Sequence, residues 1–192
     1  MRKVIVTVGP RACGKSDFCE KAITIEPAIV LISRDKLLVE MFGSTSLNAY
    51  SGGHFIALER MWEMVSEKLR SSSESIIILD TWNGSSEERS LMIRKLRDLG
   101  TNHIEAWYFI TPVESVDAWF WKKPGVAKIG EMRKRQGEGL VFYSEDAPRR
   151  DYELFHQFAS RIDSDGFDRV IRINPLAIQP EHVLDFQTSL NL

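Results

Sequence analysis

Short apolar runs divide the chain at regular intervals, with polar or amphipathic stretches between them. These runs are rich in β-branched or aromatic residues and, apart from the last, are mostly apolar, which is typical of strands buried on both faces. They cover residues 3–8, 28–32, 75–80, 104–110 and 168–173. The pattern therefore predicts five buried strands.

The segments between the strands have helical periodicity. In the clearest of them, over 54–70, one face collects the apolar side chains Ile56, Met61, Met64, Val65 and Leu69. Further helices are expected over 16–23, 36–42, 85–99, 112–121 and 151–164. Strands that alternate with helices predict an α/β fold, with a parallel sheet and helices on both faces. We expect a single domain over 1–192, in which 175–192 form a short tail.

Composition narrows the class of protein. The chain has 192 residues, of which 43% are hydrophobic and 27% charged, as in ordinary globular domains. The net charge of −2 argues against general binding to nucleic acid, so such binding would need a local basic surface. Cys13 and Cys19 fit neither a zinc site nor a redox pair. The first apolar run ends at Gly9 and is too short for a signal peptide or a membrane span. We expect a cytoplasmic protein that does not bind membranes.

A phosphate-binding loop follows the first strand and precedes the first helix. Its signature is Gly9-x-x-x-x-Gly14-Lys15-Ser16. Backbone N–H groups of such a loop point at phosphate, and the following helix adds the positive end of its dipole. Lys15 is expected to reach the β- and γ-phosphates, and the Ser16 hydroxyl to hold Mg²⁺. The expected nucleotide contacts are Gly9, Pro10, Arg11, Ala12, Cys13, Gly14, Lys15 and Ser16.

Two aspartates follow neighbouring strands of the predicted sheet. Parallel sheets bind ligands beyond the carboxyl ends of their strands, so Asp35, Asp80 and the loop should meet at one edge. Asp80 could help to hold Mg²⁺ or contact the acceptor, and Asp35 could accept the proton of an attacking hydroxyl or orient it. Either aspartate could instead only cap a helix.

Three motifs together resemble a known family. GPRACGKS, ISRDKLL and IIILDTWNGSSEER are similar to the kinase domain of the polynucleotide kinase-like P-loop family, which includes phage kinases. The resemblance implies a three-layer fold with a five-stranded sheet in the order 2-3-1-4-5. It also implies ATP and Mg²⁺ as cofactors, and transfer of the γ-phosphate to a 5′-hydroxyl of DNA or RNA. On the acceptor side it places Arg34, Asp35 and Asp80, with Asp35 as the general base.

The chain departs from this family at two places. The arginine that the family carries three positions after the base is Leu38 here. The arginines of the family's lid correspond to Trp119 and Lys123, and only Lys123 can supply a positive charge. The basic, glycine-containing stretch 122–139 is expected to be a mobile helical lid. Within it, Arg133 is the expected replacement for the missing clamp.

Consecutive aromatic residues at 119–121 are unusual. Neighbours on a helix point about 100° apart, so these three side chains cannot all face one core stripe. At least one is expected to face a cleft or a partner, although two core positions and one surface position remain an alternative. Trp82 follows the strand-end aspartate. Trp119 and Trp82 could form a platform on which an acceptor base stacks.

These features favour an ATP- and Mg²⁺-dependent kinase for a hydroxyl of a nucleic acid or nucleotide. A second possibility is a kinase for the hydroxymethyl group of a modified pyrimidine, such as 5-hydroxymethyluracil, in phage DNA. A nucleoside or nucleotide kinase fits the same motifs. A fourth possibility is an ATP-binding switch that acts through partners. The altered lid favours the switch, whereas Asp35 argues against it. The sequence leaves the oligomeric state open.

Overall fold

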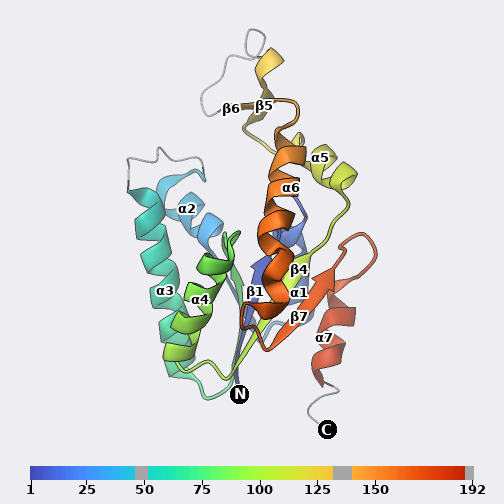
Figure 1. The fold of residues 1–192 in the computed structure, drawn as a ribbon. Coiled ribbons are helices and arrows are strands. Elements are labelled where there is room, and N and C mark those ends of the chain that lie inside the picture. The colour runs from blue at the N-terminus through green and yellow to red at the C-terminus, as the bar shows by residue number, and fades with distance from the viewer. Residues whose placement is uncertain (46–51, 132–139, 189–192) are drawn as a thin grey trace.

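A parallel sheet forms the centre of the protein (Figure 1). The computed structural model describes residues 1–45, 52–131 and 140–188. The five strands of the sheet lie in the order β2-β3-β1-β4-β7, and every neighbouring pair is parallel. They span β1 Arg2–Val8, β2 Ile29–Ser33, β3 Ser75–Asp80, β4 His103–Phe109 and β7 Arg169–Ile173. The expected order is confirmed, with β7 as the fifth strand.

Helices cover both faces of this sheet (Figure 1). On one face Val4, Val6 and Val8 pack with side chains of α3, α4 and α6, and on the other Ile5 packs with side chains of α1, α5 and α7. The helices span α1 Lys15–Ile25, α2 Arg34–Phe42, α3 Gly53–Ser71, α4 Ser86–Asp98, α5 Val113–Phe120, α6 Ala147–Phe158 and α7 Pro180–Thr188. Because β1 contributes to two cores, its residues are apolar on both sides.

In the last third of the chain the structure differs from the expectation in a second small sheet and in the limits of one helix. A second, two-stranded parallel sheet pairs β5 (Val126–Lys128) with β6 (Val141–Tyr143). Strands of three residues carry too short a pattern to be predicted. The helix expected over 151–164 begins at Ala147, ends at Phe158 and continues as a 3₁₀ turn, Ala159–Ser164. The tail contains α7, which packs against α1.

The region expected to be a lid lies beyond α5. In Figure 1 the β5–β6 pair lies at one end of the molecule, away from the N-terminus. Of the expected lid, 122–139, the structure describes Lys122 to Glu131, so Arg133 lies outside the described residues. A hydrogen bond from the Arg11 guanidinium to the Tyr143 hydroxyl (3.4 Å) connects the phosphate loop to β6. Within the described ranges, no helix is both long enough and apolar enough to cross a membrane.

Candidate active site

The loop between β1 and α1 has the tight path that its glycines suggest. A Cβ at Gly9 would lie 2.8 Å from Cys13 Sγ and 2.9 Å from Phe109 Cβ, so no larger residue fits there without moving the loop. Gly14 caps α1 in the left-handed conformation, at φ 88°. Ala12 also has a positive φ, 60°, which is costly for an alanine. The loop is therefore held in a conformation that its surroundings impose.

Lys15 lies across this loop. Its ammonium group donates hydrogen bonds to the carbonyl oxygens of Gly9 (2.8 Å) and Pro10 (2.7 Å). The Thr111 hydroxyl donates to the carbonyl of Cys13 (2.7 Å) and ties the loop to the end of β4. Neutral carbonyls are weaker partners for an ammonium ion than phosphate oxygens. Lys15 is thus placed to exchange its carbonyl partners for the phosphates of a nucleotide.

Asp80, the last residue of β3, is hydrogen-bonded to side chains from three other elements. The residue is 8% exposed, and its carboxylate accepts hydrogen bonds from the hydroxyls of Thr7 (2.8 Å), Ser16 (3.2 Å) and Ser33 (3.4 Å). These come from β1, α1 and β2, and Ser33 pairs directly with Asp80 in the sheet. The sequence did not single out Thr7 and Ser33. The signal that could have found them is a hydroxyl at the end of each strand beside β3.

This oxygen cluster fits a magnesium ion better than a softer metal. Mg²⁺ takes few protein ligands, often one carboxylate, and completes its shell with water and nucleotide phosphates. Asp80 and Ser16 supply a carboxylate and a hydroxyl next to the phosphate loop. The described residues contain no group of three or more histidines, cysteines or acids that could bind a metal alone. The donor set therefore suits Mg²⁺ that arrives together with a nucleotide.

Asp35 lies in the first turn of α2 but does not cap it. The cap is Ser33, whose hydroxyl accepts the backbone N–H of Lys36 at 3.5 Å. The Asp35 carboxylate is 63% exposed and pairs with the Arg34 guanidinium at 3.2 Å. Nor does Asp80 cap α4, since Ser85 performs that function. Neither aspartate therefore serves as the helix cap that the sequence left open as an alternative.

One cleft of about 850 Å³ brings these groups together. This volume lies within the range of about 300–1,000 Å³ usual for small-molecule sites. Expected site residues on its wall are Gly9, Arg11, Ala12, Cys13, Gly14, Lys15, Ser16, Arg34, Asp35, Asp80, Trp82, Trp119 and Lys123. Pro10 is not on the wall. The sequence did not predict His54, Lys21, Pro175, Leu176 or Gln179, which also line the cleft.

The cleft is electropositive although the whole chain is acidic. Its acidic side chains are Asp17, Asp35 and Asp80, whereas its basic ones are Arg11, Lys15, Lys21, Arg34, Lys122 and Lys123. Lys123 is exposed at the wall, yet desolvation of its ammonium group and the charge of Lys15 lower its pKa, while Asp35 acts in the opposite direction. An excess of positive charge in a hollow attracts phosphorylated ligands.

The tryptophans of the cleft have separate neighbours. Trp119 lies beside Gly14, where its ring would be 3.2 Å from an added Cβ, and Pro175 flanks the same glycine. Trp82 is 45% exposed and packs against Phe155 of α6, edge to face, at a centroid distance of 5.5 Å. Of the three consecutive aromatics, Trp119 faces the cleft. The structure thus brings Trp82 and Trp119 into one cleft. Trp82 packs on α6, whereas Trp119 packs beside the phosphate loop.

The remaining two aromatics belong to the base of the lid region. Phe120 is 2% exposed and meets Tyr143 of β6 edge to face. Trp121 donates its indole N–H to Asp117 (3.0 Å), and the ammonium group of Lys128 lies 5.2 Å from the centre of its ring. These contacts hold β5 and β6 against α5.

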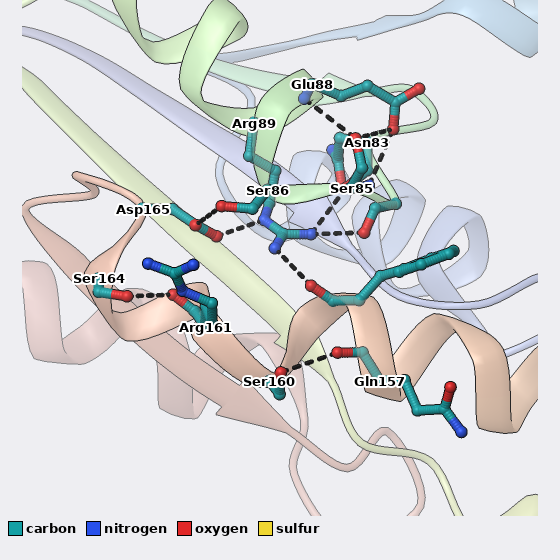
Figure 2. A network of polar contacts seen from close by, with 12 residues as sticks. Asn83, Ser85, Ser86, Glu88, Arg89, Gln157, Ser160, Arg161, Ser164 and Asp165 are labelled. Atoms are coloured by element: carbon teal, nitrogen blue, oxygen red, sulfur yellow. Dashed lines mark hydrogen bonds and ion pairs between the residues drawn. The ribbon is translucent and has the colours of Figure 1, made fainter.

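A buried arginine of α4 fixes the loop that carries Trp82 (Figure 2). The Arg89 side chain has no exposed surface. It donates to the carbonyls of Asn83 (3.2 Å), Gly84 (2.7 Å) and Phe158 (2.9 Å), and to the carboxylate of Asp165 (2.6 Å). This network ties the loop after β3 to the end of α6. Sequence reasoning noted Arg89 only as part of a family motif.

These observations define a class. A parallel sheet in the order β2-β3-β1-β4-β7, a glycine-rich loop before α1 and a strand-end aspartate beside its serine make this chain a P-loop domain of the kinase type. The chain belongs to the AAA domain family, which matches residues 4–128. No curated protein sequence matches it.

Several solved structures are similar to this chain in fold. A chain of the Pnkp1/Rnl/Hen1 RNA repair complex is 19% identical, with a TM-score of 0.62 over 83% of this chain and 46% of that one. A fungal RNA kinase is 16% identical, with a TM-score of 0.52 over 90% and 38%. Shikimate kinase from Acinetobacter baumannii is 15% identical, with a TM-score of 0.57 over 100% and 96%. This chain spans about half the length of the first. At such identities the likeness shows the fold alone.

Proposed function

We propose that this protein is an ATP- and Mg²⁺-dependent kinase that phosphorylates a hydroxyl group of a nucleic acid or nucleotide. The observation that carries the proposal is the meeting of the loop, the Asp80 hydroxyl cluster and the exposed Asp35 in one basic cleft. A nucleotide-dependent switch needs the first two but has no use for an exposed carboxylate beside them. A kinase needs all three.

Each group has a distinct role in this reaction. The loop N–H groups and Lys15 bind the triphosphate. Ser16 and Asp80 would hold Mg²⁺, which offsets the negative charge of the phosphates when it is bound. Asp35 orients the acceptor hydroxyl and takes its proton. Lys123 lines the same cleft as Lys15 and offers a positive charge that can stabilise charge on the transferred phosphoryl group. Arg133 remains a proposed second clamp.

The acceptor is proposed to be a polynucleotide 5′-hydroxyl or a related group. The likeness in fold to a chain of the RNA repair complex and to the fungal RNA kinase supports this choice. Trp119 adjoins the loop that would hold the donor phosphates, whereas Trp82 follows Asp80 and has 45% of its surface exposed. We therefore assign the acceptor base to Trp82 rather than to Trp119. Base stacking on such a ring contributes about 1–3 kcal/mol.

One alternative acceptor has a specific observation in its favour. The exposed indole of Trp82 can also stack a base whose own hydroxymethyl group is the acceptor. Such a base must leave the helical stack of DNA to reach the cleft. A 5-hydroxymethyluracil in phage-type DNA, and free nucleosides or nucleotides, are therefore included among the acceptors to be tested.

The test follows γ-labelled phosphate from ATP in the presence of Mg²⁺. Acceptors are 5′-hydroxyl DNA and RNA, nucleosides and nucleotides, and DNA that contains 5-hydroxymethyluracil. Asp35→Asn is expected to reduce transfer by about 100-fold or more, because the loss of a general base costs about 10²–10⁴ in rate. Affinity for ATP should not change.

Glu40→Gln is the matched control, since it removes the same charge from an exposed position of the same helix. It should transfer phosphate like the original protein. If ATP is consumed at one rate with or without every acceptor, and Asp35→Asn leaves that rate unchanged, the kinase proposal is wrong and the switch remains.

A further inference from the structure

The wall of the cleft at the end of α5 offers a phosphoryl group no guanidinium. Of the described residues, those that line the cleft there are Trp119, Lys122, Lys123 and Pro124. During transfer, charge spreads over the three oxygens of the phosphoryl group. An indole cannot stabilise this charge, and a lysine does so as a point charge without two parallel donors. Any planar fork of donors must therefore come from another element.

Two arginines, Arg34 and Arg11, are among the described residues that line the cleft. Arg34 pairs with the Asp35 carboxylate at 3.2 Å, so its charge is already compensated. Arg11 belongs to the phosphate loop and is exposed, and its guanidinium donates to a neutral partner, the Tyr143 hydroxyl, at 3.4 Å. That bond is long and uses one of the five N–H donors of the group. Arg11 therefore has both a positive charge and donors available for an anion.

The charge of Arg11 acts where the donor and acceptor sides of the cleft meet. Desolvation lowers the pKa of Lys123 most, the charge of Lys15 lowers it further, and Asp35 raises it. The charge of Arg11 also lowers this pKa. Interactions between charges in solution fade beyond about 10 Å. Lys123 thus lies within range of the lysine of the phosphate loop, of the proposed general base and of Arg11 together.

We propose that the Arg11 guanidinium binds the transferred phosphoryl group and stabilises its charge during transfer. In this step the bond from the γ-phosphorus to the oxygen shared with the β-phosphate breaks, and a bond to the acceptor oxygen forms. The acceptor proton passes to Asp35, and ADP leaves with the shared oxygen. Two parallel N–H groups of Arg11 match two oxygens of the group, which replace the Tyr143 hydroxyl as partner. This inference rests on the proposed kinase function and adds a catalytic residue to it.

The first test measures transfer of γ-labelled phosphate from ATP by Arg11→Gln. Its kcat should fall about 100-fold or more, because a donor to charge that develops in the transition state contributes about 10²–10³ in rate. KM for ATP should change less than about threefold, since the contact strengthens only during transfer. Arg11→Lys keeps the charge but not the two parallel donors, and should retain only part of kcat.

Tyr143→Phe separates a phosphate contact from a mere link between the loop and β6. It breaks the same hydrogen bond as Arg11→Gln but leaves the guanidinium in place, so kcat should stay within about threefold of the original. Arg150→Gln is the matched control for charge. Arg150 is exposed, pairs with Asp146 at 3.5 Å and does not line the cleft, so this variant should transfer phosphate like the original protein.

A binding measurement keeps the test independent of any acceptor. Calorimetry gives the affinity for ADP and Mg²⁺ with and without aluminium fluoride, which occupies the place of a phosphoryl group in transfer. The original protein should bind at least about tenfold more tightly with the fluoride, as expected of a transition-state mimic. Arg11→Gln should lose most of this gain, whereas its affinity for ADP and Mg²⁺ alone should stay within about threefold.

Other results would overturn the inference. If Tyr143→Phe lowers kcat as much as Arg11→Gln does, Arg11 only ties the loop to β6. If aluminium fluoride strengthens binding equally in the original protein and in Arg11→Gln, or in neither, Arg11 does not bind the phosphoryl group. Absence of label transfer to every acceptor would count against the kinase proposal alone, because the fluoride titration needs no acceptor.

Discussion

Replacement of Arg89 by methionine tests whether its network holds the site together. Methionine fills a similar volume but removes every N–H donor. The carbonyls of Asn83, Gly84 and Phe158 would lose their partner, and the carboxylate of Asp165, whose side chain is 2% exposed, would lose its counter-charge (Figure 2). The Ser86 hydroxyl would remain as a donor to Asp165.

The size of the effect follows from the burial of the pair. Loss of one partner from a buried ion pair costs about 3–5 kcal/mol, because the other charge stays in the interior without compensation. We expect Arg89→Met to lower the free energy of unfolding by about 4 kcal/mol. For a chain of this length that corresponds to about 8–16 °C in Tm. Such a loss is a large fraction of the stability of an ordinary domain, about 5–15 kcal/mol.

The assay is urea unfolding followed by circular dichroism, with Arg150→Met as control. Arg150 forms an exposed pair with Asp146 at 3.5 Å, and its loss should cost no more than about 0.5 kcal/mol. The double variant Arg89→Met with Asp165→Asn removes both charges and should be more stable than Arg89→Met alone. If Arg89→Met costs less than about 1 kcal/mol, or the double variant recovers nothing, the network does not stabilise this loop.

Two further predictions concern the loop and the pH dependence of stability. Gly9→Ala should weaken ATP binding about tenfold or more, since its Cβ would lie within 2.9 Å of Cys13 Sγ and Phe109 Cβ; Gly130→Ala, which meets nothing within 4 Å, should not. Equal affinities in a fluorescent-nucleotide titration would contradict this. Burial lowers the pKa of His156 below its usual 6.5, so the unfolded chain binds the proton first and stability falls as pH drops below about 6.5. Urea midpoints should fall less on acidification in His156→Gln, and an unchanged slope would refute it.

The sequence determined the sheet and the loop because both depend on local patterns. The short, largely apolar runs of β1 and β3 are typical of strands buried on both faces, and their alternation with helices favours a parallel sheet. The glycine spacing at Gly9 and Gly14 specifies a phosphate loop because few other sequences permit that backbone path. The strand order came from the family resemblance and is confirmed. Asp35 and Asp80 reached one cleft because parallel strands end at the same edge.

Only the tertiary structure decided how those residues are supported. The hydroxyls of Thr7 and Ser33 meet Asp80 through strand register, which no local pattern encodes. Arg89 reaches Asp165 across a separation of 76 residues, and sequence spacing alone does not indicate such a contact. The three-residue strands β5 and β6 are too short to carry a period of their own. Local sequence patterns thus identified the chemical groups of the site. The partners of these groups depend on contacts between segments that are far apart in the sequence.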